Sequence, residues 1–313
     1  MLVVKNLADA SGDDHGSEGA TAGRGSVRFL HSEAAPSAQR LRLGLHLREL
    51  RLRAGLKQGE VARRLGASES KVSRIETGTF KAKPAFLEAL FDAYVVHDAA
   101  ERARLREIAG EVNEAAWWQP WKGVSQPYLQ ALVSCEDLAV RVKSYEPQCL
   151  HGLLQTSAYG QALIRRGRGG PEAHEELWKF RAERQRRFTE DTGKSFIGVV
   201  DESALRRTVE SSAVMREQIE HLLELMDDAR FQLRLAEQFN PRVHSEIGPL
   251  TIFDFAEPIM PSVACAELFD GSVVYQDAEM VDRRIVKFDA LRVASLAPDA
   301  TRRKLQQLRT LYK

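Results

Sequence analysis

The sequence predicts two folded domains: an all-α domain of five helices over residues 40–112, and an α+β domain with a sheet of about five strands over residues 117–313. Three observations favour this division. A length of 313 residues suits about two domains. Apolar residues recur at helical spacing in the first region, whereas short β-branched runs separated by Gly and Pro recur in the second. Residues 1–38 are rich in Gly, Ser, Ala and Asp, and we expect them to form a disordered arm.

The composition excludes several classes of protein. With 43% hydrophobic and 28% charged residues, the chain resembles ordinary globular proteins. Its apolar runs are shorter than the roughly 18 residues of a membrane helix, so we expect no membrane association. Cys135, Cys149 and Cys265 are widely spaced and form no CxxC, which excludes a disulfide scaffold and a cysteine-based zinc site. These features predict a cytoplasmic protein.

Charge is distributed unevenly along the chain. The whole sequence has a formal net charge of +1, but residues 40–83 contain twelve bases and only four acids. Such an asymmetry is typical of a module that binds a polyanion, joined to a second, more acidic region. The alternative is a helical surface rich in solvated bases.

The basic segment has the pattern of short amphipathic helices. Leu43, Leu47, Leu50 and Ala54 form one apolar stripe, and Gly55 ends that helix. The remaining helices are expected at residues 58–65, at 68–77, from Pro84, and at about 99–112. Together they predict a compact all-helical domain.

The second and third of these helices have the spacing of a helix-turn-helix motif. Gly66 and Ala67 form the turn, and Ser68 caps the third helix. With Val72 and Ile75 directed inward, the positions left on the outer face are Glu69, Ser70, Ser73 and Arg74. A face of this kind can enter the major groove of DNA.

These residues also carry a family resemblance. The pattern Leu50-Arg51 … Gly55-Leu56 … Gln58 … Val61-Ala62 … Leu65-Gly66 … Ser68 … Val72-Ser73-Arg74-Ile75-Glu76-Thr77-Gly78 resembles the domain of Cro/cI-type (XRE) regulators over about residues 41–95. The resemblance implies a lambda-repressor-like fold and a homodimer that binds paired half-sites on double-stranded DNA. It also implies an ion pair between Arg51 and Glu76 at the margin of the core. One departure is Lys57, where a Ser or Thr usually caps the second helix.

Each outward residue receives an expected role. Gln58 lies at a helix N-terminus, where it can hydrogen-bond a phosphate, and Arg74 can bind guanine O6 and N7 in bidentate fashion. Ser68, Ser70 and Ser73 can contact phosphate or base edges, while Lys71, Lys81 and Lys83 neutralise phosphates. Glu69 either accepts from cytosine N4 or repels phosphate and limits nonspecific binding.

The second region contains helix and strand signals in mixed order. Helices are expected at about 128–145, 156–166, 172–190, 212–228, 278–295 and 299–311. Strands are expected at 195–200, 231–236, 250–255, 262–267 and 272–276. The basic residues Lys179, Arg181 and Arg184 to Arg187 are expected to form a solvated helix face; the alternative is a contact with DNA backbone or with an acidic partner.

A second resemblance covers about residues 117–310. The stretches Glu146-Pro147 … His151-Gly152-Leu153-Leu154-Gln155-Thr156 … Tyr159, Glu183-Arg184-Gln185 and Val199-Val200-Asp201-Glu202 … Leu205-Arg206 are similar to the companion domain of WhiJ-like streptomycete regulators. This resemblance implies a regulator paired with a small companion protein in an antitoxin-like arrangement.

Two groups of residues are candidates for binding that partner. Trp117, Trp118 and Trp121 offer apolar surface, as do His151 and Gln155 with a few polar groups. The alternatives are that the tryptophans belong to an interdomain core and that His151 is a satisfied core histidine.

The sequence therefore predicts a sequence-specific DNA-binding transcription regulator, nucleoid-associated when bound to DNA, whose larger domain binds a partner or effector. The alternative is an antitoxin-like protein that sequesters a small partner and uses DNA binding for autoregulation. The histidines lack metal-ligand spacing and no set of nucleophile, acid and base converges, so we expect no metal, no cofactor and no enzymatic activity.

Overall fold

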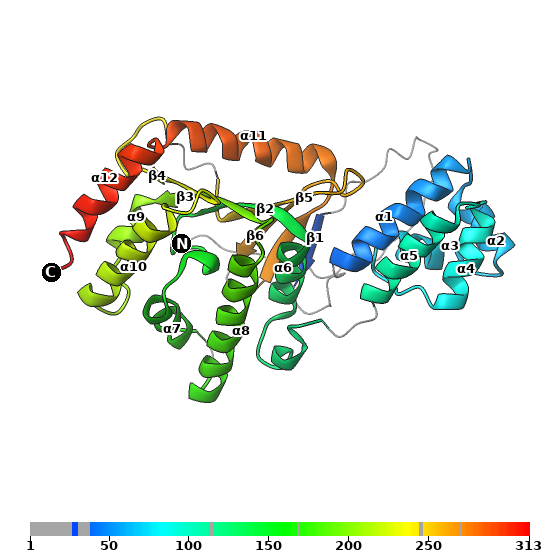
Figure 1. Ribbon diagram of the computed structural model, residues 1–313, viewed down its shortest axis with the longest axis horizontal. Helices are drawn as coiled ribbons and strands as arrows, with labels where there is room; N and C mark the ends of the chain where they lie inside the picture. Colours follow the sequence, from blue (N-terminus) through cyan, green and yellow to red (C-terminus); the bar gives the residue numbers. More distant parts are fainter. Residues whose placement is uncertain (1–26, 31–37, 113–115, 168, 244–246, 269–270) are drawn as a thin grey trace, which may run out of the picture.

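The computed structural model describes residues 27–30, 38–112, 116–167, 169–243, 247–268 and 271–313. A helical domain lies at one end of an elongated molecule, and a larger α+β domain forms the rest (Figure 1). Both domains have the predicted fold class. Within the described ranges, no helix is long and apolar enough to cross a membrane.

The N-terminal domain consists of the five expected helices. They are α1 (Ala38–Arg53), α2 (Gln58–Arg64), α3 (Glu69–Glu76), α4 (Pro84–Ala93) and α5 (Ala99–Glu111). Leu47, Val61, Val72, Phe91 and Ile108 meet in one apolar core. The stripe that begins at Leu43 is buried, so the helical period correctly identified the inward face of α1.

Helix α1 packs unusually close to the end of α3. A Cβ atom on Gly44 would lie only 2.4 Å from the carbonyl oxygen of Glu76. Only glycine allows this approach, which brings the side chains of Arg51 on α1 and Glu76 on α3 into contact.

The C-terminal domain is built on a mixed sheet of seven strands in the order β1-β7-β6-β5-β2-β3-β4. The strands are β1 (Val27–Leu30), β2 (Ala139–Glu146), β3 (Ser195–Asp201), β4 (Phe231–Ala236), β5 (Leu250–Phe255), β6 (Val263–Leu268) and β7 (Gly271–Tyr275). Strands β2, β3 and β4 are parallel, and the remaining pairings are antiparallel. The five expected strands are present as β3 to β7.

Strand β2 corrects the expected helix over residues 128–145. The helix ends at Leu138, and the chain continues directly as a strand between β3 and β5. The β-branched residues Val140 and Val142, one exposed and one buried, suit a strand rather than a helix. Neither Gly nor Pro separates the two elements, so no punctuation marks the change.

Strand β1 corrects part of the expected disordered arm. Residues Val27–Leu30 pair antiparallel with β7 at one edge of the sheet. The sheet therefore includes a strand from outside the range 117–313 that was expected to fold as the second domain. Residues 1–26 and 31–37, also assigned to the arm, lie outside the described residues.

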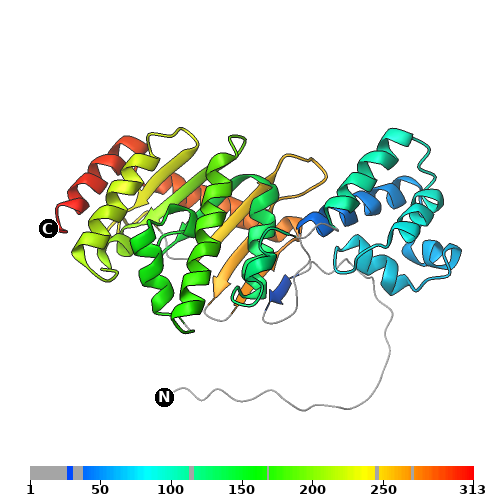
Figure 2. The same ribbon diagram turned by 60° about the horizontal axis from the view of Figure 1, so that its bottom comes forward.

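Helices cover both faces of the sheet (Figures 1 and 2). Helix α11 (Ala278–Ala294) packs on one face, where Phe288 meets Val199 and Ile252. The opposite face is covered by the other large helices, α6 (Pro127–Leu138), α7 (Ser157–Arg165), α8 (Pro171–Glu190), α10 (Ser212–Leu225) and α12 (Pro298–Arg309). Short elements complete the domain: η1 (Gln119–Trp121), η2 (Gly152–Leu154) and α9 (Glu202–Arg206).

The two domains meet along α1. The backbone N–H of Ala38 donates to Ser134 Oγ on α6 at 2.5 Å. On the β5–β6 connection, Glu257 accepts from Arg42 Nε at 3.0 Å, and its other oxygen lies 3.0 Å from His46 Nε2. Hydrogen bonds to Arg42 lower the pKa of the Glu257 carboxyl to about 2. The helical domain is thus fixed to the sheet by polar contacts.

Candidate functional site

The turn between α2 and α3 has the geometry that the sequence predicts. Gly66 takes a left-handed conformation with φ of 59°. Ser68 caps α3 by accepting from the N–H of Lys71 at 3.2 Å. The N-terminus of α2 lacks a side-chain cap at Lys57, and instead the Glu60 carboxylate accepts from the Lys57 N–H at 2.7 Å.

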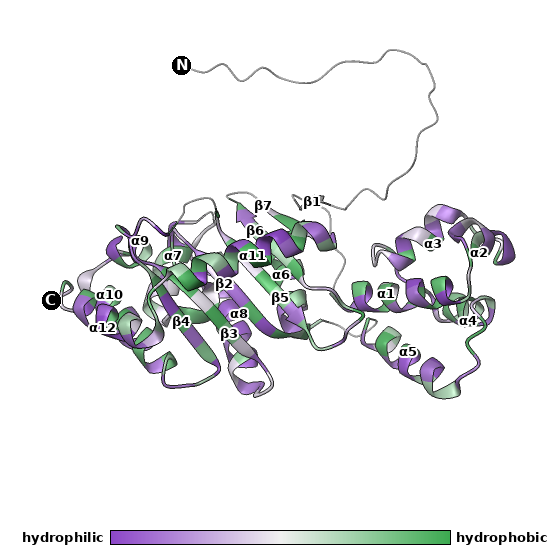
Figure 3. Ribbon diagram, turned by 90° about the horizontal axis from the view of Figure 1, so that it is seen from above, coloured by the Kyte–Doolittle hydropathy of each residue, from purple (hydrophilic) through white to green (hydrophobic). Residues whose placement is uncertain are grey.

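One face of α3 is polar and directed away from the core. Glu69, Ser70 and Arg74 are exposed, while Lys71 and Ser73 are half-buried. Helices α2 and α3 lie at the end of the molecule remote from the C-terminal domain, and much of their ribbon has the colour of hydrophilic residues (Figure 3). This is the geometry that allows a recognition helix to enter a groove without obstruction.

Basic side chains around this face lack acidic partners. Seven bases have no ion pair with any residue that the structure describes: Lys57, Arg63, Arg64, Lys71, Arg74, Lys81 and Lys83. By contrast, Arg42, Arg51 and Arg53 on α1 all pair with carboxylates. These three bases of α1 thus maintain the fold, whereas the seven bases nearer α3 remain available to an external anion.

Aromatic rings support two of these bases. Lys71 Nζ lies 3.8 Å from the centre of the Phe86 ring, and Arg74 Cζ lies 5.3 Å from that of Phe80. Such contacts hold a long side chain without neutralising its charge.

Glu76 connects four helices beneath this face. Its carboxylate accepts from Arg51 Nε at 2.7 Å and from Arg51 Nη2 at 3.0 Å. It also accepts from Gln58 Nε2 at 2.8 Å and from the Tyr94 hydroxyl at 3.3 Å. Arg51 is 7% exposed and Glu76 is 3% exposed, so the expected ion pair is present and buried. The contacts from Gln58 and Tyr94 had no signal in the sequence.

The contact to Glu76 changes the interpretation of Gln58. The sequence predicts that this side chain binds a phosphate, but in the structure one of its amide N–H groups donates a hydrogen bond to Glu76. The side chain therefore positions α2 against the end of α3. A direct phosphate contact would need its second amide proton.

The three tryptophans of the domain junction pack onto the C-terminal domain. Trp118 is 7% exposed, and Trp117 stacks on Phe180 of α8 with ring centroids 5.6 Å apart. Trp121 lies 5.9 Å from the same ring. Trp118 is thus part of the core and Trp117 and Trp121 are half-buried against α8, which favours the packing alternative over partner binding.

A cavity of about 480 Å³ opens at the end of the sheet where strands β2 and β6 finish. The carboxyl ends of β2 and β6 lie at this same end of the sheet, because both strands run antiparallel to β5, which lies between them. After β2 the chain forms β3 on one side of it, and later forms β5 on its other side. Ligand sites of α/β proteins commonly lie at such a reversal of strand order. Residues from α6, α7 and α8 complete the wall.

His151 and Gln155, two of the residues singled out in the sequence, line this cavity. His151 is 5% exposed, and burial lowers its pKa well below the ordinary value, so the imidazole is neutral. Its Nδ1 lies 3.3 Å from the Leu153 N–H, and its Nε2 lies 3.4 Å from Arg184 Nη2. A neutral imidazole has one protonated and one unprotonated ring nitrogen. The ring can therefore accept a hydrogen bond from the Leu153 N–H or from Arg184, but not from both.

The segment that joins these residues is held by side-chain amides. Gln155 Nε2 donates to the Leu150 carbonyl at 2.6 Å, and Gln185 Nε2 donates to the Gly152 carbonyl at 2.7 Å. Gln218 Nε2 donates to the Leu154 carbonyl at 2.7 Å. Side-chain amides from this stretch, from α8 and from α10 thus hold the backbone of residues 150–154 in place beside the cavity.

Two arginines of α8 reach the cavity and correct the expected solvated face. Arg184 is 6% exposed and forms two hydrogen bonds with Glu136 on α6, at 2.7 and 2.6 Å. Arg181 Nη1 donates to Gln155 Oε1 at 2.6 Å. The sequence contained a sign of this burial: Arg184 lies on the same helix face as the apolar Phe180 and Phe188, where a solvated base is not expected.

The strand ends contribute two carboxyl groups that sequence reasoning missed. Burial raises the pKa of Glu146, the last residue of β2, to about 8. Burial likewise raises the pKa of Glu267 near the end of β6, and the neighbouring Arg184 opposes that rise. Cys149 also lines the cavity, and burial raises the pKa of its thiol to about 11. Across the described part of the chain, no group of three or more His, Cys, Asp or Glu side chains could hold a metal ion.

Comparison with known protein families agrees with this two-part structure. A model described as "Helix-turn-helix domain" matches residues 42–105, which comprise α2 and α3 and most of the helical domain. A model described as "Domain of unknown function (DUF5753)" matches residues 129–307, more than half of the chain. No curated protein and no solved structure shows a significant match. The chain therefore belongs to the family of proteins with the domain of unknown function DUF5753, here preceded by a helix-turn-helix domain.

Proposed function

We propose that this protein is a sequence-specific transcription regulator of the Cro/cI (XRE) type, whose C-terminal domain binds an effector or partner. The helix-turn-helix domain supports a DNA-binding regulator. The observation that most favours the finer proposal is the set of seven bases without acidic partners around α3. A polyanion that meets this surface releases counterions from its phosphates and gains affinity without breaking any internal ion pair.

The residues of α3 divide into two roles. Arg74 is exposed near the end of the helix and is suited to bidentate recognition of guanine. Ser70 and Ser73 can contact base edges or phosphate, and the Ser68 hydroxyl can donate to phosphate while its oxygen caps the helix. Lys71, Lys81 and Lys83 neutralise phosphates.

Glu69 remains open between two roles. It can accept from cytosine N4, or it can limit nonspecific binding by repelling phosphate. In the structure its carboxylate faces Gly59 on α2: a Cβ atom there would lie 3.1 Å from Glu69 Oε2.

The protein acts as a homodimer in this proposal. A helix of eight residues contacts only a few base pairs, and regulators of this geometry bind paired half-sites. The resemblance to Cro/cI-type regulators supports the dimer.

The C-terminal domain acts by binding rather than by catalysis. The Cys149 thiol in its cavity, with a pKa of about 11, remains protonated at neutral pH and is not an activated nucleophile. Helix α6 lies against both the cavity and the helical domain: Tyr128 and Leu129 line the cavity, and Ser134 contacts the start of α1. This arrangement supports control of DNA binding by whatever the C-terminal domain binds.

The alternative function is an antitoxin-like one, in which the C-terminal domain sequesters a small companion protein. The WhiJ-like resemblance implies this arrangement. Exposed apolar side chains on α11 favour a protein partner, since Val286 is 66% exposed and Val293 is 72% exposed. Unchanged capture of a companion by an Arg74→Ala variant, whose operator binding is weakened, would favour this alternative.

Footprinting tests the proposal directly. The purified protein is incubated with the genomic region around its own coding sequence, because regulators of this type commonly control their own expression. We expect a protected site with two related half-sites, formed in excess unrelated DNA. Protection that disappears when unrelated DNA is added would contradict sequence-specific binding.

A further inference from the structure

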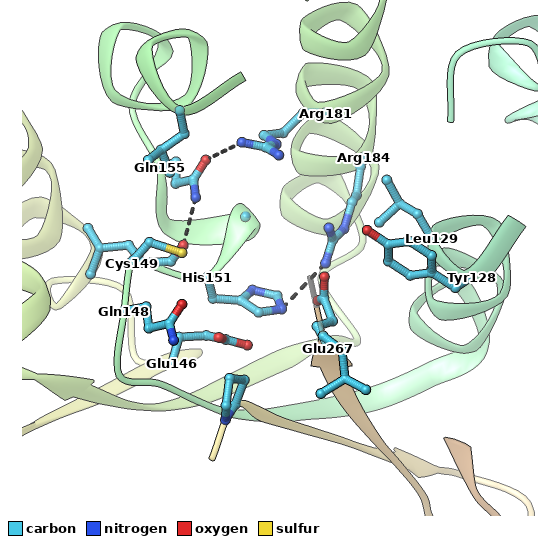
Figure 4. A pocket seen from close by; sticks show the side chains of 15 residues that line it. Tyr128, Leu129, Glu146, Gln148, Cys149, His151, Gln155, Arg181, Arg184 and Glu267 are labelled. Atoms are coloured by element: carbon cyan, nitrogen blue, oxygen red, sulfur yellow. Dashed lines mark hydrogen bonds between the residues drawn. The ribbon is translucent and has the colours of Figure 1, made fainter. Parts of the chain in front are cut away.

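The charged groups of the C-terminal cavity are arranged on different sides of it (Figure 4). Arg181 lies beside Gln155, towards the segment that leads into α7. Glu146 and Glu267 lie at the ends of β2 and β6, and His151 and Arg184 lie between the two sides.

Arg181 is a cation without an acidic partner in the described structure. Its Nη1 donates to Gln155 Oε1 at 2.6 Å, and no carboxylate of the described residues lies within ion-pair distance of it. Arg184 differs, since Glu136 matches its charge through two hydrogen bonds. Burial and the neighbouring Arg184 lower the pKa of Arg181 to about 10, against an opposing effect of Glu267, so it remains charged at neutral pH. An anionic group of a ligand would supply the missing partner.

Glu146 and Glu267 are two acids without a basic partner at ion-pair distance within the residues that the structure describes. Neither carboxyl has a base within ion-pair distance among the described residues, although both line the cavity. Burial is the main cause of the raised pKa of both carboxyls; Glu267 raises the pKa of Glu146 further, and Arg184 opposes the rise in each. A ligand ammonium, with three N–H donors, can satisfy two carboxylates at once.

We propose that this cavity binds a small zwitterion of di- or tripeptide size, with its carboxylate on Arg181 and its ammonium between Glu146 and Glu267. The cavity of about 480 Å³ lies within the range of roughly 300–1,000 Å³ typical of small-molecule sites. Leu129, Leu150 and Leu163 on its wall suit apolar side chains of such a ligand.

Other ligand chemistries match the walls less well. A nucleotide or other phosphate ester would bring at least one extra negative charge towards Glu146 and Glu267, with only Arg181 unmatched to receive it. A simple amine would leave Arg181 without a partner. Only a molecule with both charges satisfies both sides.

The ligand acts as the effector of the regulator, and this part of the inference rests on the proposed function. Glu136 and Ser134 lie two residues apart on α6, one holding Arg184 at the cavity and the other contacting α1. A ligand that moves α6 therefore changes the support of the helical domain.

Titration calorimetry on the full chain without DNA tests binding. The probes are dileucine, trileucine and their valine and phenylalanine counterparts, with free termini, compared with N-acetylated and C-amidated forms. We expect one or more free peptides to bind, and capping either end to weaken binding at least tenfold. Binding at pH 7 should release protons, because the ammonium favours the ionised form of Glu146. Heats measured in two buffers of different ionisation enthalpy detect that release.

Two variants locate the site. Arg181→Gln should lose at least tenfold in affinity for the free peptide and show no further loss when the C-terminus is amidated. Glu146→Gln should lose at least tenfold in affinity for the free peptide, show no further loss when the N-terminus is acetylated, and reduce proton release, since Glu267 remains. The control is Arg186→Gln on the same helix, an exposed arginine paired with Glu183 and Glu190, which should bind like the parent. Since either cavity variant could misfold, circular dichroism is compared first, and each variant tests one end independently.

The results separate this inference from the proposed function. No binding by any free peptide, or binding that is indifferent to capping, overturns the zwitterion site even if the protein binds its operator. Peptide binding together with absence of operator binding supports the site and contradicts the regulator.

Discussion

Arg42 on α1 donates two hydrogen bonds to Glu257, a residue 215 positions later in the chain on the β5–β6 connection. The same carboxylate contacts His46 on α1, and Arg104 on α5 lies 3.5 Å from it. One acid of the C-terminal domain therefore fixes three bases of the DNA-binding domain, and its removal should loosen the connection between domains.

We expect Glu257→Gln to lower the stability of the domain contact by roughly 1 kcal/mol, because the pair is only partly buried. Its partners hold the pKa of Glu257 at about 2, below its ordinary value of 4.5. A carboxyl whose pKa is lower in the folded than in the unfolded protein stabilises the folded state at pH values above its unfolded pKa. This stabilisation is lost as the pH falls to the pKa of the folded protein. The difference in melting temperature between parent and variant should therefore be full at pH 7 and shrink between pH 4.5 and pH 2.

The control for this comparison is Glu279→Gln, an exposed acid whose one ion pair among the described residues is with Arg283 within α11. It should melt like the parent at every pH. A Glu257→Gln variant indistinguishable from this control at pH 7 would show that the contact does not stabilise the domain arrangement.

Glu76→Gln should destabilise the helical domain strongly. The substitution leaves the buried Arg51 without a counter-charge, which costs about 3–5 kcal/mol in comparable buried pairs. Glu49→Gln removes an exposed partner of Arg53 and should cost only about 0–1 kcal/mol. Chemical denaturation followed by circular dichroism measures both, and equal effects would contradict the structural role of Glu76.

The operator should contain two half-sites about one helical turn apart, roughly 34–36 Å, each bound by one protomer. Light scattering on the complex should give the mass of two chains per operator. A single chain bound to a single half-site would refute the dimer.

The sequence predicted the helical domain more completely than the sheet. Leu43, Leu47 and Leu50 follow a 3.6-residue period that does not depend on distant partners, and the turn at Gly66 has its own local signal. Strand β2 was missed because a strand between two neighbours is decided by pairing with β3 and β5 rather than by its own eight residues.

The candidate sites show the same division. The outward face of α3 could be predicted because a helix determines which residues share a side. The cavity could not, because Glu146, Arg181 and Glu267 come together only when the sheet has formed. Glu257 lies in a loop without any periodic pattern, so its contact with Arg42 had no sequence signal either.

The recognition role of α3 is tested most directly by fluorescence anisotropy of the full chain on its footprinted operator and on unrelated DNA, over a range of salt concentrations. Arg74→Ala should weaken operator binding by about 1–3 kcal/mol and relax the preference at one base pair, with little change on unrelated DNA. Lys81→Ala should weaken binding to both DNAs and reduce the salt slope by about one. Unchanged operator affinity in Arg74→Ala would contradict the assignment of α3 as the helix that reads the sequence.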